Sequence, residues 1–495
     1  MIFGRDYKGA NTIIGGVGAT ITTAALLATK LGIAASRITF FEVSGLEVRA
    51  TITGTYTMAQ QAFRNNTEIT YFKDEDNLCI ALTNYSFQNC TSFTECKLEG
   101  VVSMAEGNFN NCRVKNFNFP NLKNVGNQPF WGNPEMLSFN APVLDNFYGS
   151  GNFFTNCTKL VTVNTPLINK LGGSHFSGCS SLVSVSYPNL VTITGNSTFL
   201  SCTSLVSVSL PLITSIVAQM FRSCSKLLNV SFPNVTSISY NTFTDCTLLN
   251  SIYFPEVTTI DTSNFNNTRL VNVSLPKIVN LNTFNFRNIQ TLVTVDLPLV
   301  KNIGQYSFDN CPNLENISLS GVSTIGDYAF RGCAKLPNLG TLNYLVTVGI
   351  NAFDSCSSVN FNIVDFPILQ NVPNYMLFNC INVKNVNLPL ANRLGDYSFF
   401  NCPQLTTLNT QEVTSVGINL FSSFGAYTMP LNSFYAPKCA VLGNTVNTDE
   451  QVFRRVKNGF QITVKSSLAT VNAGAPDADL VWATTNKAAV INYVP

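Results

Sequence analysis

Charged residues and histidine are scarce in this sequence, and each shortage excludes a class of function. Only 11% of the 495 residues are Asp, Glu, Lys or Arg, less than half of the ~25% found in average soluble proteins. The 29 basic and 27 acidic side chains leave a net charge of +2, which provides no electrostatic footprint for nucleic acid or an anionic membrane. The single histidine, His175, leaves almost no material for histidine-based acid–base or metal chemistry. The composition therefore favours a structural or binding protein without a cofactor.

Motifs that would support catalysis, nucleotide binding or a metal site are also missing. The glycines at 15–18 are not followed by Gly-Lys-Ser/Thr, and no Gly-x-Ser-x-Gly or His-Glu-x-x-His occurs. The acidic run 74–76 could bind Ca²⁺ through clustered oxygens, but it lacks EF-hand spacing and is interpreted as a solvated turn between repeats. His175 lies on a turn before Phe176 and is predicted to be a surface or turn residue. We therefore expect no enzyme activity, no catalytic residue and no metal ligand.

No part of the sequence has the composition of a membrane-spanning helix. Residues 9–29 are uncharged and long enough to span a bilayer, but they contain four Gly and five Thr and few large aliphatic residues. A signal peptide is the alternative, because Arg5 and Lys8 form a basic start. Lys30 interrupts the apolar part, however, and Met1 is present. The prediction is an ordered anchoring or oligomerising segment.

A short repeat dominates what the sequence does contain. The anchor Phe-x-x-Cys recurs about every 22 residues in about 17 complete or degenerate copies, such as FQNC (87–90) and FDNC (308–311). Each anchor is followed by an apolar pattern that ends in proline, such as LVSVSLP (205–211) and LVTVDLP (292–298). The alternation predicts a short strand, and the proline ends it by removing a backbone donor. Because so small a unit cannot enclose its own core, the copies are expected to stack into a solenoid.

Units such as LVSVSLPLITSIVAQMFRSC (205–224) and LPLVKNIGQYSFDNC (297–311) resemble the BspA-type leucine-rich repeat. That family forms parallel-strand solenoids in bacterial surface adhesins, some protist surface proteins and phage tail fibres. The resemblance implies a mainly β fold, a leucine-rich-repeat solenoid of about 17 coils with parallel strands.

Three regions are expected from the extent of the repeat. The solenoid is predicted over 58–440, between an N-terminal anchoring and capping segment, 1–57, and a C-terminal cap, 441–495. Residues 38–58 alternate like paired strands that lead into the first coil. The C-terminal cap is interpreted as two strands with the turn NAGAPDAD (472–479) between them.

Twelve of the 15 cysteines occupy the repeat position after the Phe anchor. Two observations argue against a disulfide framework. The number of cysteines is odd, and the repeat cysteine is replaced singly, by Asn66, Asn133 and Thr268, whereas a disulfide framework would lose cysteines in pairs. The cysteines are therefore predicted to form a ladder of buried thiols that behave as small hydrophobes. Unpaired thiols suit assembly in a reducing cytoplasm.

The outward strand positions form the candidate ligand-binding surface, on the expected concave face of the solenoid. If Leu182 and Val185 point inward, the alternating residues of the same strand point outward. This face is rich in hydroxyls and amides and lacks the aromatic and arginine anchors that are typical of protein-binding faces. Two hypotheses remain open, weak multivalent carbohydrate contact or no ligand at all. The candidates are Ser184, Ser186, Ser207, Ser209, Asn229, Ser231, Ser251, Tyr253, Asn272, Ser274, Thr294 and Asp296.

These observations favour a non-enzymatic phage virion component, a tail fibre or similar fibre assembled in the host cytoplasm. Residues 1–57 would attach it to other virion proteins, and the solenoid would contact host-surface glycans. Met1, the unpaired thiols and the adhesive family support this hypothesis. The alternatives are a BspA-like adhesin on a bacterial cell surface that binds host proteins, and a purely structural virion decoration protein. A homotrimer is implied by analogy with phage fibres, and neither nucleic acid nor a membrane span is expected.

Overall fold

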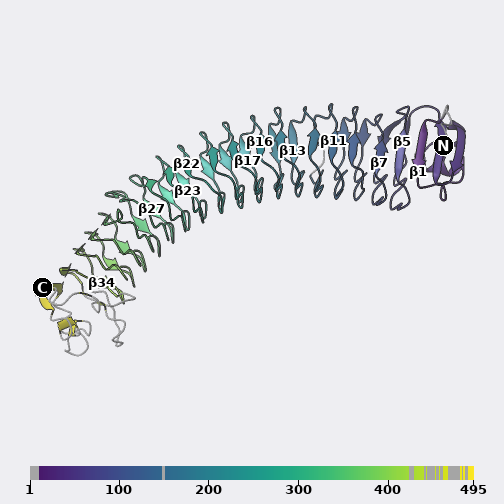
Figure 1. The fold of residues 1–495 in the computed structure, drawn as a ribbon. Helices are drawn as coiled ribbons and strands as arrows, with labels where there is room; N and C mark the ends of the chain where they lie inside the picture. The colour runs from purple at the N-terminus through teal and green to yellow at the C-terminus, as the bar shows by residue number, and fades with distance from the viewer. Residues whose placement is uncertain are drawn as a thin grey trace. The chain divides into compact units, whose positions relative to one another are not determined.

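The computed structural model describes residues 10–147, 151–422, 429–439, 442, 452, 456, 461–465, 480–481, 483–484 and 489–494. Over this part the chain is mainly β, with about 17 turns of a parallel-strand solenoid, and Figure 1 shows the successive coils. The chain forms two compact units, residues 1–235 with 242–249, and residues 236–241 with 250–495. The predicted fold class is confirmed.

Most coils contribute one strand to each of two rows. The first row holds the strands that precede the proline, and its members pair in parallel and in register, as Ser184 with Ser207 between β14 and β16. In the first unit these strands are β5 (Tyr71–Asp74), β7 (Glu95–Lys97), β9 (Asn116–Asn118), β11 (Ser138–Asn140), β12 (Thr162–Asn164), β14 (Ser184–Ser186), β16 (Ser207–Ser209) and β18 (Asn229–Ser231). In the second unit they are β20 (Ser251–Tyr253), β22 (Asn272–Ser274), β24 (Thr294–Asp296), β26 (Asn316–Ile317), β29 (Ile363–Asp365), β31 (Asn385–Asn387), β33 (Thr407–Asn409) and β35 (Ser433–Ala436).

The second row holds the shorter strands that follow the proline. They also pair in parallel, as Asn302 with Thr324 between β25 and β27. In the first unit they are β4 (Tyr56–Met58), β6 (Cys79–Leu82), β8 (Ser103–Met104), β10 (Asn124–Val125), β13 (Lys170–Gly172), β15 (Thr192–Thr194) and β17 (Ser215–Ile216). In the second unit they are β19 (Ser237–Ile238), β21 (Thr259–Ile260), β23 (Asn280–Leu281), β25 (Asn302–Ile303), β27 (Thr324–Ile325), β28 (Thr347–Val348), β30 (Asn371–Val372), β32 (Arg393–Leu394) and β34 (Ser415–Val416).

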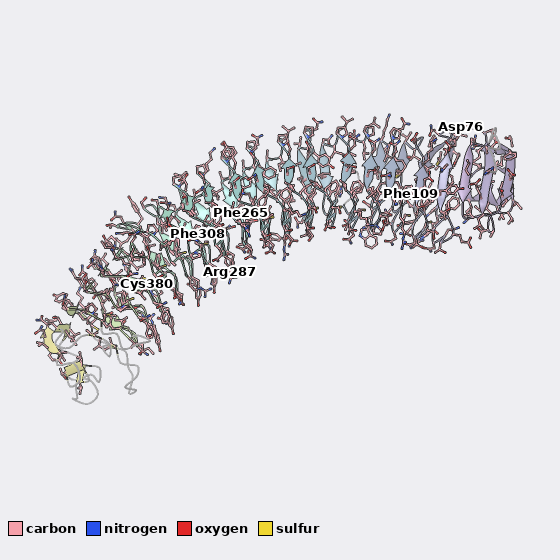
Figure 2. The ribbon with its side chains drawn as sticks, viewed as in Figure 1. Asp76, Phe109, Phe265, Arg287, Phe308 and Cys380 are labelled. Atoms are coloured by element: carbon pink, nitrogen blue, oxygen red, sulfur yellow. The ribbon has the colours of Figure 1, made fainter. Side chains whose placement is uncertain are left out.

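The anchor phenylalanines form the centre of each coil. Phe308 is fully buried, and its ring stacks on Phe286 and Phe330 of the neighbouring coils at centroid distances of 5.5 and 5.3 Å. Phe308 is labelled in Figure 2. Each anchor thus covers the next coil's anchor, as expected for units that cannot bury a core alone.

The repeat cysteines form the predicted ladder of buried thiols. The 15 cysteines are free thiols, and all of those in the repeat position are buried. The thiol of Cys333 donates a hydrogen bond of 3.2 Å to the carbonyl oxygen of Phe308, one coil earlier. The same contact recurs along the repeat, and where Asn133 replaces cysteine its amide donates to the carbonyl of Phe109 at 2.8 Å. The position therefore requires a small buried donor, which cysteine provides at little desolvation cost.

Each anchor from Phe63 to Phe399 is flanked by two residues in the left-handed backbone region, two positions before and two positions after it. Around Phe308 these are Tyr306 and Asn310, with φ of 56° and 58°. A side chain in this region costs roughly 1–2 kcal/mol, and glycine and asparagine tolerate it best. The later position holds Asn, Gly, Ser or Asp in every described copy. This requirement explains why the residue before the repeat cysteine varies so little.

The N-terminal segment covers the edge of the first strand row. Its elements are β1 (Thr12–Gly15), α1 (Ala24–Leu31), a 3₁₀ turn (Ala35–Arg37), β2 (Ile38–Ser44) and β3 (Glu47–Ile52). The predicted paired strands are confirmed as β2 and β3, which are antiparallel, and β1 joins β3 to β5. No helix among the described residues is long and apolar enough to cross a membrane. The boundary at 57 and the anchoring role stay predictions.

The C-terminal segment contains two paired strands, as predicted, but the strands are parallel and are therefore not joined by a tight turn. Its strands β36 (Gln461–Lys465) and β37 (Val490–Val494) do pair, but they are parallel, with Ile462 opposite Ile491. Parallel neighbours require a crossover rather than a tight turn. The NAGAPDAD segment and the boundary at 440/441 lie outside the described residues.

His175 lies on a turn, as predicted, but it is buried rather than at the surface. Its side chain has no exposed area, and its ring centroid lies 5.2 Å from that of Phe147. The N–H of Gly172 donates to Nε2 at 3.1 Å, and Nδ1 lies 3.3 Å from the carbonyl oxygen of Gly173. Burial lowers the pKa of His175 to about 4. The physical reason is positional, because the residue directly before the anchor points inward in other copies too, as Ser307 does.

Asp74 is also buried, so the solvated-turn interpretation of the acidic run is wrong for this residue. Its Oδ2 accepts a 2.6 Å hydrogen bond from the N–H of Cys79, and burial raises its pKa. Glu75 instead pairs with Lys97, and the amide of Asn11 donates to Asp76 at 3.0 Å. The three carboxylates thus serve different partners, and the described residues hold no group of three or more side chains suited to a metal.

Candidate functional site

The twelve predicted strand-face residues lie on the outer side of the first row. Leu182 and Val185 are buried as predicted, and eleven of the twelve candidates are exposed, Thr294 being half-buried. In the second unit, the Ser274 hydroxyl donates to the Asp296 carboxylate at 2.8 Å. Within each unit the register therefore places the candidates on the outer face of the first row, and whether that face binds a ligand stays a prediction.

Amide side chains on this face hydrogen-bond to each other from coil to coil. The amide of Asn164 donates to Asn140 at 2.6 Å, and that of Asn140 donates to Asn118 at 2.7 Å. An amide in such a chain uses one donor and one acceptor for its neighbours and retains the others for water or a ligand. The face is therefore neutral, polar and largely bonded to itself.

A different surface of the second unit carries aromatic side chains at one repeat position, in three consecutive coils and, after Asn351, in two more. We call Phe284, Tyr306, Tyr328, Tyr375 and Tyr397 the aromatic row, and each lies two positions before an anchor. Phe284, Tyr306 and Tyr328 stack at centroid distances of 4.9 and 4.7 Å, and Tyr375 stacks on Tyr397 at 4.9 Å. All five are half-buried, so the row is reachable from solvent.

The backbone sets the spacing of these rings. The N–H of Tyr306 donates to the carbonyl of Asp327, and that of Tyr328 to the carbonyl of Ile350, both at 2.9 Å. Residues of this row have φ between 55° and 61°, a region in which bulky side chains are rare. Ring stacking of about 0.5–1.5 kcal/mol per pair offsets part of that backbone cost. The sequence thus places aromatic rings where asparagine would fold at less cost.

Charged side chains alternate beside part of the row. In four consecutive coils the position directly after the anchor holds Arg287, Asp309, Arg331 and Asp354. Asp309 is almost completely buried and lies between two arginines. Arg287 donates through Nε to Oδ2 at 2.9 Å, and Arg331 donates through Nε to Oδ1 at 2.8 Å and through Nη2 to Oδ2 at 3.0 Å. Both arginines remain more than one-third exposed, and Figure 2 labels Arg287. The buried carboxylate therefore fixes two accessible guanidinium groups.

The arginines lie within cation–π distance of the rings in the stack. The guanidinium carbon of Arg331 lies 4.8 Å from the ring centre of Tyr328 and 5.6 Å from that of Tyr306. Tyrosine and arginine are the residues most enriched at binding hot spots, so this surface has the composition that the strand face lacks.

Replacing Asp309 with asparagine is expected to lower the free energy of unfolding by about 1–2 kcal/mol. The amide loses the charge-assisted hydrogen bonds, but both arginines stay partly solvated, which limits the loss. Glu256→Gln is the control, because Glu256 forms an exposed pair with Lys277 and such pairs contribute about 0–1 kcal/mol. Urea unfolding of both variants checks this, and equal losses would contradict the structural role of Asp309.

The sequence prediction missed the aromatic row, although a signal for it was present. The motifs IGQYSF (303–308) and IGDYAF (325–330) repeat a tyrosine two positions before the anchor. That these tyrosines stack on one another follows only from the left-handed backbone at their position and from the coil-to-coil register. Neither can be derived from strand periodicity.

Comparisons with known proteins agree with this architecture. The model of the BspA-type leucine-rich repeat region matches residues 38–137, 150–250, 214–321 and 301–427. A search of curated proteins finds no match.

Similar solved structures include a leucine-rich repeat protein from Bacteroides ovatus, which is 22% identical and has a TM-score of 0.48. The match covers 60% of this chain and 82% of that chain. A leucine-rich cell surface protein from Faecalibacterium prausnitzii has 15% identity, coverage of 89% and 91%, and a TM-score of 0.30. The pneumococcal vaccine antigen PcpA has 12% identity, coverage of 92% and 87%, and a TM-score of 0.26. Because the family model spans more than half of the sequence, the chain belongs to the BspA-type leucine-rich-repeat family.

Proposed function

We propose that this chain is a non-enzymatic adhesin that binds a host-surface partner through the aromatic row and its two arginines. The observation that carries this proposal is the row itself, five aromatic residues held half-exposed in a backbone conformation that disfavours them. Folding alone would favour asparagine there, as at Asn351. Aromatic and arginine side chains provide large, pre-organised contact area for a partner.

The predicted strand face is retained as a second proposed surface. Its hydroxyls and amides, spaced by the coil repeat, suit weak multivalent contact with a glycan. Such contacts would add along the row, because each coil presents nearly the same groups.

The proposed site of display is the surface of a phage particle, with residues 1–57 as the attachment to other virion proteins and a trimer as the assembly. The free, buried thiols support assembly in a reducing cytoplasm. The family supports the alternative, a bacterial surface adhesin. Co-purification with particles, together with thiol titration and N-terminal sequencing, distinguishes the two. Oxidised cysteines or a processed N-terminus would contradict display on a virion.

The double variant Tyr306→Asn with Tyr328→Asn is expected to reduce adhesion to host cells at least tenfold. Its stability should stay within about 1 kcal/mol of the wild type, because asparagine relieves the left-handed backbone cost while stacking and cation–π contacts are lost. Cell adsorption of the purified full-length protein measures the first effect, and thermal unfolding measures the second.

Tyr85→Asn is the matched control. Tyr85 has φ of 62° and a guanidinium, that of Arg64, 5.1 Å from its ring centre, but it lies in the first unit, outside the aromatic row. It should leave adhesion unchanged. Unchanged adsorption of the double variant would overturn the proposal, and loss of adsorption on changing Ser184, Ser207 and Asn229 to lysine would assign binding to the strand face.

A further inference from the structure

The first strand row of the second unit is interrupted at the coil between Cys333 and Cys356. The coil from Cys333 to Cys356 is one residue longer than the preceding coil, and the coil from Cys356 to Cys380 is two residues longer. The coil after β26 contributes no strand of its own to the row, only an isolated pairing of Thr341 with Asp365. The ladder of the first row is therefore irregular at this coil.

A pocket of about 550 Å³ lies at this interruption. Its polar lining comes from three successive coils and consists of Glu315, Asn316, Lys335, Ser357, Ser358 and Asn360. The volume falls within the range of small-molecule sites. The regular coils present a ladder of hydrogen-bonded side chains, whereas here the polar groups surround a space.

The charges in this pocket are internally balanced. Glu315 and Lys335 form an ion pair of 2.7 Å, and both side chains remain about half exposed. An anionic ligand would have to compete with Glu315 for the ammonium group, and a cation would have to compete with Lys335 for the carboxylate. A neutral ligand can accept a hydrogen bond from Lys335 and donate one to Glu315 without breaking the ion pair.

Hydrogen-bonding capacity is left over beside this pair. The side-chain amide of Asn360 and the hydroxyl of Ser357 make no hydrogen bond to another described residue, and the Ser358 hydroxyl accepts only from the N–H of Asn360, at 3.1 Å. Val359, 72% exposed, also lines the pocket and adds an apolar contact. Amides, hydroxyls and an ion pair around a small apolar patch match a ring that has hydroxyls at its edge and C–H groups on its face.

We propose that this pocket is a glycan-binding subsite that takes one or two residues of a neutral oligosaccharide. The proposal deepens the adhesive function above and rests on it for its biological role, but it concerns a different surface from the aromatic row. The ligand's hydroxyls would donate to Glu315 and accept from Lys335 and Asn360, while Val359 would contact its C–H face.

An array of neutral and sialylated oligosaccharides, probed with the full-length protein, tests the ligand class. We expect binding to neutral members, and the double variant Ser357→Ala with Asn360→Ala should weaken the affinity for the best neutral member about tenfold or more in calorimetry. Asn302→Ala is the matched control, since Asn302 is an exposed amide of the second strand row that already donates to Asn280 at 2.5 Å and lies outside both the pocket and the strand face. The control should retain wild-type affinity, and all variants should melt like the wild type.

Three outcomes would overturn the subsite: no binding to neutral glycans, binding to sialylated glycans alone, or equal affinities of the pocket variant and the wild type. The adhesive function fails separately, because it is measured by cell adsorption of the wild type and of the aromatic-row variant. A protein that adsorbs to cells but binds no neutral glycan would retain the proposed function and lose this inference.

Discussion

Replacing Phe308 with alanine is expected to lower the free energy of unfolding by about 3–5 kcal/mol, the cost of removing a large aromatic ring from a packed core. The ring is fully buried and stacked on both sides, by Phe286 and by Phe330. Because a solenoid is stabilised chiefly by contacts between neighbouring coils, one cavity weakens two interfaces at once. Urea unfolding monitored by circular dichroism measures the loss.

The chain provides a matched control for this variant. Leu377 occupies the same repeat position and is also fully buried, so the backbone of this corner accommodates leucine. Phe308→Leu should therefore cost less than about 1.5 kcal/mol, as expected for a nearly volume-conserving change. Equal losses for alanine and leucine would show that aromatic stacking itself, rather than filled volume, stabilises the coil.

Acidification from pH 6.5 to pH 4 is expected to destabilise the protein through His175 by about 3 kcal/mol. The folded pKa of about 4 lies below the unfolded value of 6.5, so the unfolded chain takes up a proton first as the pH falls. The contribution of His175 to stability is therefore complete above pH 6.5 and is lost as the pH approaches 4. Each pKa unit corresponds to about 1.4 kcal/mol. Urea unfolding at half-unit pH intervals measures the slope.

His175→Asn is the control for this pH dependence, because Asn285 occupies the same buried position in another copy. The asparagine variant should lose the destabilisation between pH 6.5 and pH 4. Asp74 and Asp354 act in the opposite direction, since burial raises the pKa of each carboxyl and their protonation favours the folded state. A wild type and a variant with the same pH profile would contradict the role assigned to His175.

Much of the fold could be predicted because the repeat encodes it redundantly. The alternation in LVSVSLP (205–211) places Leu205 inside and Ser207 outside, as the structure shows, and the same pattern recurs in coil after coil. Phe308 and Cys333 were predictable as interior residues for the same reason. A residue that is wrongly assigned to the interior or the surface in one copy can be reassigned by comparison with the same position in the other copies.

The incorrect and missing predictions concern residues whose surroundings depend on neighbouring coils. His175 was placed at the surface or on a turn because it directly precedes Phe176 on a predicted turn, although its repeat position is interior. Asp74 was assigned to a solvated turn because its hydrogen-bond partner, the N–H of Cys79, lies beyond the local run. The rings of Tyr306 and Tyr328 meet only through the left-handed backbone and the coil register. The pocket beside Asn360 lies where the first strand row is interrupted, and strand periodicity does not predict that interruption.

The thiol ladder has a consequence for how the chain is synthesised. Each repeat cysteine donates to the carbonyl of the anchor one coil earlier, as Cys333 does to Phe308 and Cys356 to Phe330. A coil that has left the ribosome therefore offers an acceptor and a stacking surface that only the next coil to emerge can fill. The N-terminal strands, which pair onto β5, are translated first and give this growth a closed starting edge. Folding can thus advance with translation, one coil at a time, without waiting for distant segments.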